Sequence, residues 1–223
     1  MIEVRNLRKS YSIDGQTLKA VDDVSFTVNR GEMVSIIGHS GSGKTTLLSL
    51  MGGLTRPDSG VVMIDRENIW SMTDAGLSEF RNSKMNFIYQ FSSLIPTLTS
   101  LENILLPTAF GKEYSSDVAG HAMELLEIVG LKEKINSFPS HLSGGQQRRI
   151  AIARAFVNRP SIVLADEPTG DLDEETEGEV LDLFSKINRE EQTTFIMVTH
   201  NRDIASRAGK QFRMSNGVLS EIT

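Results

Sequence analysis

The segment that most constrains this chain is a glycine-rich loop between a strand-like and a helix-like stretch. Residues 33–37 are mostly apolar and β-branched, which predicts a buried parallel strand. Residues 44–51 combine helix formers with apolar spacing, which predicts a helix. Residues 38–45 read Gly-His-Ser-Gly-Ser-Gly-Lys-Thr and match the pattern G-x-x-x-x-G-K-S/T. A strand, this loop and a helix in that order indicate an α/β core that binds phosphate.

The loop residues have the chemistry that a triphosphate needs. Glycines let the backbone wrap around a phosphate and point N–H groups at it, and the following helix N-terminus adds partial positive charge. Lys44 is expected to reach the β- and γ-phosphates, and the Thr45 hydroxyl to bind Mg²⁺. A glycine-rich turn that binds nothing is the alternative, which the complete pattern disfavours. The predicted phosphate-binding residues are Gly38, Ser40, Gly41, Ser42, Gly43, Lys44, Thr45 and Thr46.

A second buried strand, at residues 161–167, ends in two acids. The apolar run before Asp166 fits a central strand of a parallel sheet, where ligands bind at the carboxyl ends of the strands. Asp166 is therefore expected to hold Mg²⁺ through water, and Glu167 to act on the attacking water as a general base. The alternative is an acidic strand end that only caps the turn made by Pro168 and Gly170.

Another anion-binding pattern lies far downstream of the loop. Residues 142–146 read Leu-Ser-Gly-Gly-Gln and precede a helix-forming, Ala- and Arg-rich stretch at 147–155. Ser143 can cap this helix, and the backbones of Gly144 and Gly145 can closely approach an anion. We call such an anion-binding segment an anion cradle. One triphosphate needs only one anion cradle, so the presence of a second indicates a further role for it. Glycine caps between two ordinary helices are the alternative.

These motifs, in this order over the whole chain, resemble the ATPase subunits of ATP-binding-cassette (ABC) transporters. The resemblance implies that ATP and Mg²⁺ are the ligands and that a second copy of the chain is a partner. In that family the segment with Ser143, Gly144, Gly145 and Gln146 closes the site of the opposite subunit, so that two ATP molecules are buried in a head-to-tail dimer. Hydrolysis then drives an integral membrane permease, which is the second partner implied.

The resemblance also gives roles to residues that are weak signals by themselves. Gln90 follows a short strand-like segment and matches the glutamine that senses Mg²⁺ and the γ-phosphate and links the core to a helical subdomain. His200 follows another such segment and matches the switch histidine that contacts the γ-phosphate. Tyr11 matches the aromatic residue that stacks on adenine. Residues 170–173 resemble the loop that reaches across the dimer interface, but Asp171 departs from the family's usual sequences and leaves its contacts open.

The predicted fold is α/β. It has a P-loop NTPase core with a mainly parallel sheet, an N-terminal antiparallel β-layer and an inserted α-helical subdomain at about residues 91–155. Strand signals in residues 1–30 suggest the β-layer. Apolar residues at helical spacing predict amphipathic helices at 116–130 and 174–189. The length of 223 residues fits a single ABC ATPase domain spanning residues 1–223.

Composition limits the kinds of ligand and partner that the chain is expected to bind. The absence of cysteine excludes disulfides and thiolate metal sites. The net charge of −6 disfavours nucleic acid as a partner, since nucleic-acid binders usually carry a basic patch. No apolar run approaches the roughly 20 residues that span a bilayer. The resemblance to ABC transporters, together with this absence, implies a cytoplasmic protein, peripheral on the inner face of the cell membrane through the permease. The one notable basic cluster is interpreted as ATP-side or surface charge and consists of Arg148, Arg149, Arg154 and Arg159.

A closer resemblance is carried by residues 91–104 and 166–170, which are similar to the macrolide-exporter and lipoprotein-release subfamily. It implies a permease that works by export or by mechanical transmission. A loop and helix packed on the core is the plainer interpretation of 91–104, and branches in peptide resistance, cell division and amino-acid import stay open. An ABC ATPase of DNA repair is disfavoured because the stretch between Lys44 and residues 142–146 is too short for the long coiled coils of that class. An ABC ATPase of translation is disfavoured because this chain has one cassette where that class has two. A non-hydrolysing regulatory cassette is disfavoured by the intact Lys44, Glu167 and His200.

Overall fold

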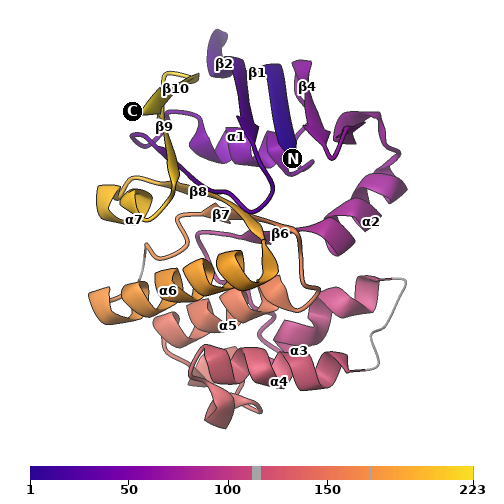
Figure 1. The fold of residues 1–223 in the computed structure, drawn as a ribbon, viewed down its shortest axis with the longest axis vertical. Coiled ribbons are helices and arrows are strands. Elements are labelled where there is room, and N and C mark those ends of the chain that lie inside the picture. Colours follow the sequence, from indigo (N-terminus) through magenta and orange to yellow (C-terminus); the bar gives the residue numbers. More distant parts are fainter. Residues whose placement is uncertain (112–116, 171, 223) are drawn as a thin grey trace.

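The computed structural model describes residues 1–111, 117–170 and 172–222. In Figure 1 one sheet stands at the top, a second crosses the middle of the molecule, and a group of helices fills the lower part. The predicted start of a helix at Ser116 and the predicted interface residue Asp171 lie outside the described residues.

Among the described residues, the larger sheet has six strands in the order β10-β9-β3-β8-β7-β6. All neighbours from β9 to β6 are parallel, and β10 is antiparallel to β9, which confirms the predicted mainly parallel sheet. Strands β7 and β8 are buried almost throughout because elements cover both of their faces. The strands are β3 (Met33–Ile37), β6 (Met85–Ile88), β7 (Ile162–Asp166), β8 (Thr194–Thr199), β9 (Lys210–Ser215) and β10 (Val218–Ile222).

The smaller sheet is the predicted antiparallel β-layer, in the order β2-β1-β4-β5. Its first two strands form a long hairpin whose outer half is largely exposed, so it extends well beyond the apolar signals in the sequence. Tyr11 and Leu18 face each other across this outer half. The strands are β1 (Ile2–Ile13), β2 (Gln16–Val28), β4 (Ser59–Ile64) and β5 (Glu67–Asn68).

The predicted helices at 44–51, 147–155 and 174–189 are present, and α3, α4 and α5 pack against one another in the lower part of Figure 1. In the described parts of the chain, no helix combines the length and the apolar character that crossing a membrane requires. The α-helices are α1 (Lys44–Met51), α2 (Asp74–Lys84), α3 (Ser100–Leu105), α4 (Val118–Ile128), α5 (Gly144–Phe156), α6 (Glu174–Glu191) and α7 (Arg202–Ser206). The 3-10 helices are η1 (Ile69–Ser71), η2 (Leu106–Phe110), η3 (Lys132–Lys134) and η4 (Pro139–His141).

Alternate residues of the central strands enter two different hydrophobic cores. Ile196 and Val198 of β8 pack on one side, in a core that also contains α1 and the antiparallel sheet. Phe195 and Met197 pack on the other side, with residues of α4, α5 and α6. This division follows from the alternation of side chains along a strand. The strand ends that carry the predicted site residues are therefore held from both faces.

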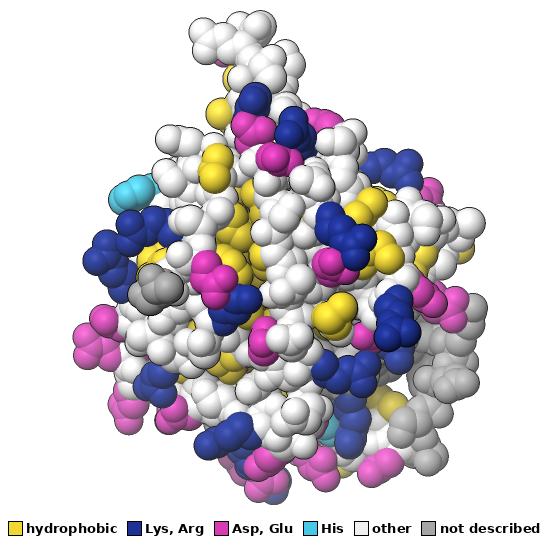
Figure 2. Space-filling view, turned by 45° about the horizontal axis from the view of Figure 1, so that its top comes forward, with side chains coloured by type: hydrophobic (Ala, Val, Ile, Leu, Met, Phe, Trp, Pro, Cys, Tyr) yellow, Lys and Arg dark blue, Asp and Glu magenta, His cyan; other side chains and the backbone are white. Residues whose placement is uncertain are grey.

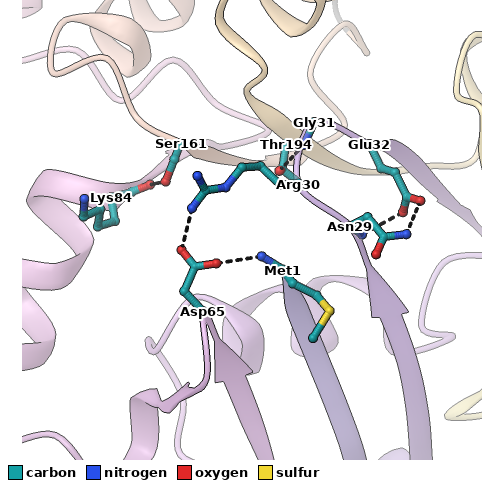
Figure 3. Close-up of polar contacts among 9 residues, drawn as sticks. All are labelled: Met1, Asn29, Arg30, Gly31, Glu32, Asp65, Lys84, Ser161 and Thr194. Carbon is teal, nitrogen blue, oxygen red and sulfur yellow. Dashed lines mark hydrogen bonds and ion pairs between the residues drawn. The ribbon is translucent and has the colours of Figure 1, made fainter.

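Polar contacts surround the connection between the two sheets (Figure 3). Asp65, directly after β4, contacts the N-terminal amine of Met1 at 2.7 Å and the Arg30 guanidinium at 3.0 Å. Asp65 and its partners are at least half exposed, so these ion pairs contribute little free energy. The backbone N–H of Gly31 donates to the hydroxyl of Thr194, at the start of β8, over 2.9 Å. This bond fixes the connection between β2 and β3 to the parallel sheet.

Phe184→Ala is expected to lower the free energy of unfolding by about 3–5 kcal/mol. The ring is fully buried, and its centroid lies 5.3 Å from that of Phe195, so truncation leaves a cavity between α6 and the sheet. Urea unfolding followed by circular dichroism measures this loss. In the control, Phe110→Ala, the side chain is 74% exposed, and the change should stay within about 0.5 kcal/mol. Equal losses in the two variants would contradict the position of this core.

Candidate active site

A cavity of about 680 Å³ opens at the carboxyl ends of β3 and β7. The fold brings most of the predicted site residues to it, although they are far apart in the sequence. Gly38 does not line the cavity, although the next residue does, and residues 143–146 do not line it either. Leu18, Ala20 and His39 line it without having been predicted. The predicted residues that line it are Tyr11, Ser40, Gly41, Ser42, Gly43, Lys44, Thr45, Thr46, Gln90, Asp166, Glu167 and His200.

Two glycines are required by the backbone path of the loop. A Cβ on Gly43 would lie 2.0 Å from the carbonyl oxygen of Ala20, and Gly43 also has a left-handed φ of 104°. A Cβ on Gly38 would lie 2.3 Å from the carbonyl oxygen of Met214. The ammonium of Lys44 donates to the carbonyls of Gly38 and His39 at 2.7 and 3.1 Å. These bonds use two of its three donors and hold the charge at the loop, where an anion needs it.

Asp166 is the last residue of β7, and its side chain hydrogen-bonds to the Thr45 hydroxyl. Burial raises the pKa of the Asp166 carboxyl above its ordinary value, and the hydrogen bond from Thr45 opposes that rise. A carboxylate beside a hydroxyl supplies the hard oxygen ligands that Mg²⁺ prefers. The described residues contain no group of three or more acidic, histidine or cysteine side chains that could hold a metal. The donor set therefore fits a Mg²⁺ ion that takes most of its other ligands from water and from the phosphates of a nucleotide.

Glu167 follows β7 directly and has a left-handed φ of 46°. A non-glycine residue in this conformation costs of order 1 kcal/mol and needs support from its surroundings. Its backbone N–H donates to the carbonyl of Val198 over 2.9 Å, which ties it to β8. One carboxylate oxygen, Oε2, accepts from the Thr199 hydroxyl at 2.9 Å, and the other, Oε1, contacts Nδ1 of His200 at 2.9 Å. Glu167 and His200, both singled out from the sequence, are thus direct neighbours.

The interpretation of the basic cluster as ATP-side or surface charge is wrong for Arg148. Only 3% of this residue is exposed, and its guanidinium donates to the carbonyls of Glu167, Pro168 and Tyr89. Three backbone acceptors compensate the burial of the charge. Arg148 therefore holds the turn that carries Glu167 and the segment before Gln90. Its spacing from buried apolar residues on α5 is the signal that could have revealed it.

Tyr11 and Gln90 lie at the rim of the cavity. Tyr11 is 38% exposed, lies across the hairpin from Leu18, and has the Lys9 ammonium 5.7 Å from its ring centroid. An exposed aromatic face beside an aliphatic side chain suits a flat heterocyclic base. Gln90 is exposed two residues after β6, and so its amide can move without disturbing the sheet.

The segment at residues 143–146 forms the N-terminus of α5. The Ser143 hydroxyl accepts from the N–H of Gln146 at 3.2 Å, and the Gln146 side chain accepts from the N–H of Ser143 at 3.0 Å, which is a reciprocal capping box. A Cβ on Gly144 would meet nothing within 4 Å, and one on Gly145 would make an ordinary contact with Leu172. Packing within this chain therefore requires neither glycine, which disfavours the alternative of simple glycine caps.

Comparison with known proteins agrees with this geometry. Residues 21–170 match the family model described as ABC transporter. A post-hydrolysis dimer of the ATP-binding cassette MJ0796 with ADP and Pi is 37% identical, covers 100% of this chain and 98% of its own, and superposes with a TM-score of 0.93. A second dimeric structure of MJ0796, described as a bacterial ABC transporter cassette, is also 37% identical, over 100% and 99%, with a TM-score of 0.92. The cassette cbiO1 of Clostridium perfringens, part of the complex cbiONQ, is 27% identical over 98% and 86%, with a TM-score of 0.85.

The fold and the cavity define a nucleotide-binding cassette with an ATPase site. The family match over residues 21–170 extends beyond half of the chain, and the 37% identity to MJ0796 extends over all of it. The chain belongs to the ABC transporter family, and it is an ATPase.

Gly43→Ala is expected to weaken ATP binding by about tenfold or more, because the added methyl group forces the loop away from Ala20. Its midpoint of thermal unfolding should also fall. Titration calorimetry with a slowly hydrolysed ATP analogue measures the affinity. Gly209→Ala is the matched control, since a Cβ at Gly209 would meet nothing within 4 Å. Unchanged affinity in Gly43→Ala would contradict the assignment of this loop.

Proposed function

We propose that this chain is the ATP-hydrolysing subunit of an ABC transporter, that it works as a head-to-tail dimer, and that it drives a separate membrane permease. One observation carries the proposal: the chain has two anion cradles that do not meet. The cavity around Lys44 lacks residues 143–146, whose exposed helix end opens elsewhere. Each cradle thus completes the other in a second copy. The dimeric structures of the MJ0796 cassette support this arrangement.

In the proposed reaction, the loop N–H groups and Lys44 bind the triphosphate, and Tyr11 stacks on the base. Thr45, Gln90 and Asp166 are the residues that would hold Mg²⁺. When bound, the ion neutralises negative charge on the phosphate oxygens. Residues 1–223 act as one ATPase domain, with a helical subdomain at about 91–155 that carries the second cradle.

Glu167 is the general base for the attacking water in this proposal. Its carboxylate is held at the edge of the cavity by contacts from the end of β8, so it is oriented before substrate binds. The His200 side chain is 72% exposed and is therefore able to turn from Glu167 to the γ-phosphate. Residues 143–146 of the second copy close the site from the other side. Burial of the charged triphosphate between two copies supplies the differential affinity for the closed dimer.

The permease is proposed to dock on a second groove, of about 550 Å³, beside Gln90. The groove lies between α2, β6 and η2, and large apolar side chains stand exposed at it: Leu54 is 46% exposed, Tyr89 45% and Phe110 74%. Exposed apolar side chains gathered in one place are typical of a protein interface. Tyr89 directly precedes Gln90, so a partner in this groove would respond to the nucleotide. The cbiO1 cassette, part of an ABC transporter complex, supports a permease partner in general.

The proposed branch is the export or mechanotransmission type, in the macrolide-exporter and lipoprotein-release group. The resemblance of residues 91–104 and 166–170 to that group supports this branch. The cassette would act on the cytoplasmic side of the membrane, attached through the permease. A nucleic-acid partner is not favoured, because basic and acidic side chains are interspersed on the face seen in Figure 2.

Glu167→Gln is expected to reduce steady-state ATP hydrolysis by about 100-fold or more while nucleotide affinity changes little, since the amide cannot accept the proton of water. Phosphate release and ATP titration measure the two quantities. Glu190→Gln, an exposed residue near the end of α6, is the control and should hydrolyse ATP at the original rate. Near-normal turnover in Glu167→Gln would remove Glu167 as the base.

Gly144→Val should abolish ATP-dependent dimerisation in the Glu167→Gln background, although the variant folds and still binds ATP. The reason is that the new side chain meets nothing within its own chain but blocks the approach of a second copy. Light scattering coupled to size-exclusion chromatography, with and without ATP and Mg²⁺, gives the dimer fraction. Gly178→Val, where a Cβ also meets nothing, is the comparison. A normal ATP-dependent dimer of Gly144→Val would contradict the head-to-tail arrangement.

A further inference from the structure

Thr199, the last residue of β8, is a fully buried hydroxyl in contact with the carboxylate of Glu167. Its Oγ1 lies 2.9 Å from Oε2 of Glu167. Burial of the whole residue leaves the side chain no solvent to bond with, so its partners are fixed by the fold. The sequence motifs gave roles to Glu167 and to His200, the residue after Thr199, but none to Thr199 itself.

The direction of the hydrogen bond is set by a second partner. The backbone N–H of Asn201 donates to Oγ1 of Thr199 over 3.0 Å. A hydroxyl has one hydrogen to donate, and its oxygen accepts through lone pairs. With Asn201 donating to the oxygen, the Thr199 hydrogen is directed to Glu167. The chain of bonds therefore runs from Asn201 through Thr199 to the carboxylate of Glu167.

The two oxygens of the Glu167 carboxylate contact side chains that differ in solvent exposure. Oε2 is held by Thr199, which is 0% exposed and belongs to a central strand. Oε1 is contacted by His200, whose side chain is 72% exposed and lies beyond the end of that strand. The proposed turn of His200 toward a nucleotide would release Oε1 and leave Oε2 in place.

We propose that Thr199 is a positioning residue for ATP hydrolysis, whose hydroxyl anchors Oε2 of Glu167 so that Oε1 takes the proton of the attacking water. This inference rests on the proposed role of Glu167 as the base. In the step, an O–H bond of water breaks as its proton passes to Oε1, and the water oxygen bonds to the γ-phosphorus. The bond from the γ-phosphorus to the bridging oxygen breaks, and the electron pair leaves with ADP.

The test compares Thr199→Val, which has a similar shape without the hydroxyl, with Thr199→Ser, which keeps the hydroxyl. Steady-state phosphate release with ATP and Mg²⁺ gives kcat and KM. Thr199→Val should lower kcat by about 10- to 100-fold with KM nearly unchanged, because a misplaced catalytic group costs up to about that factor. Thr199→Ser should recover most of the rate. In the Glu167→Gln background, single-turnover assays should show no further loss from Thr199→Val, since Thr199 acts through the carboxylate.

Thr194→Val is the matched control for a purely structural effect. Thr194 lies at the other end of β8, is also buried, and its hydroxyl accepts from the N–H of Gly31. This variant should lower the midpoint of thermal unfolding and leave kcat unchanged. If Thr199→Val does not fold, Thr199→Ala is measured in its place, because it removes the same hydroxyl without added bulk.

Three results have distinct meanings. If folded Thr199→Val has the same kcat as the unsubstituted protein while Glu167→Gln is inactive, the role of Thr199 is overturned and that of Glu167 stands. An equal fold-loss from Thr199→Val in both backgrounds also overturns it, because the residue would then act through the fold. Near-normal turnover of Glu167→Gln itself overturns the proposed base, and this inference with it.

Discussion

The site depends on the way in which parallel strands end at one edge of a sheet. β3, β7 and β8 pair in parallel, so the phosphate loop, the acids at the end of β7 and the residues after β8 meet there although they are far apart in the sequence. Both faces of these strands are covered by apolar cores, which fixes the strand ends. The buried sheet is thus the scaffold for Lys44, Asp166, Glu167 and His200, and the loops add only short extensions to it.

The second constraint is that the chain's anion cradles do not face each other. The α5 N-terminus is capped by its own side chains and carries glycines that the chain's own packing does not need. Arg148, on the same helix, binds the backbone beside Glu167 and before Gln90. The helix whose N-terminus carries residues 143–146 is therefore bonded to the turn that carries Glu167, the proposed base. In the proposed dimer, this arrangement connects the second copy mechanically to the cavity.

Sequence patterns predicted the features that depend on local chemistry. The continuous apolar runs of β3, β7 and β8 and the glycine pattern of the loop identified the core and most of the cavity. Helix α2 was missed because Leu77 is its one clearly buried residue, so its sequence shows little apolar periodicity. Arg148 and Thr199 were missed because their importance comes from long-range contacts with Glu167. Helical spacing indicates that Arg148 is buried, but neither residue carries a pattern that indicates which group it contacts.

The most direct measurement of the central claim is cross-linking between two copies across the nucleotide. The chain has no cysteine, so Ser40→Cys in one copy and Ser143→Cys in the other can be joined by a short bis-maleimide without competition from other thiols. With each substitution placed in a Glu167→Gln chain and the two chains mixed, the account predicts a cross-linked heterodimer only when ATP and Mg²⁺ are present. A cross-link that forms equally without ATP, or none with it, would contradict closure of two copies around the nucleotide.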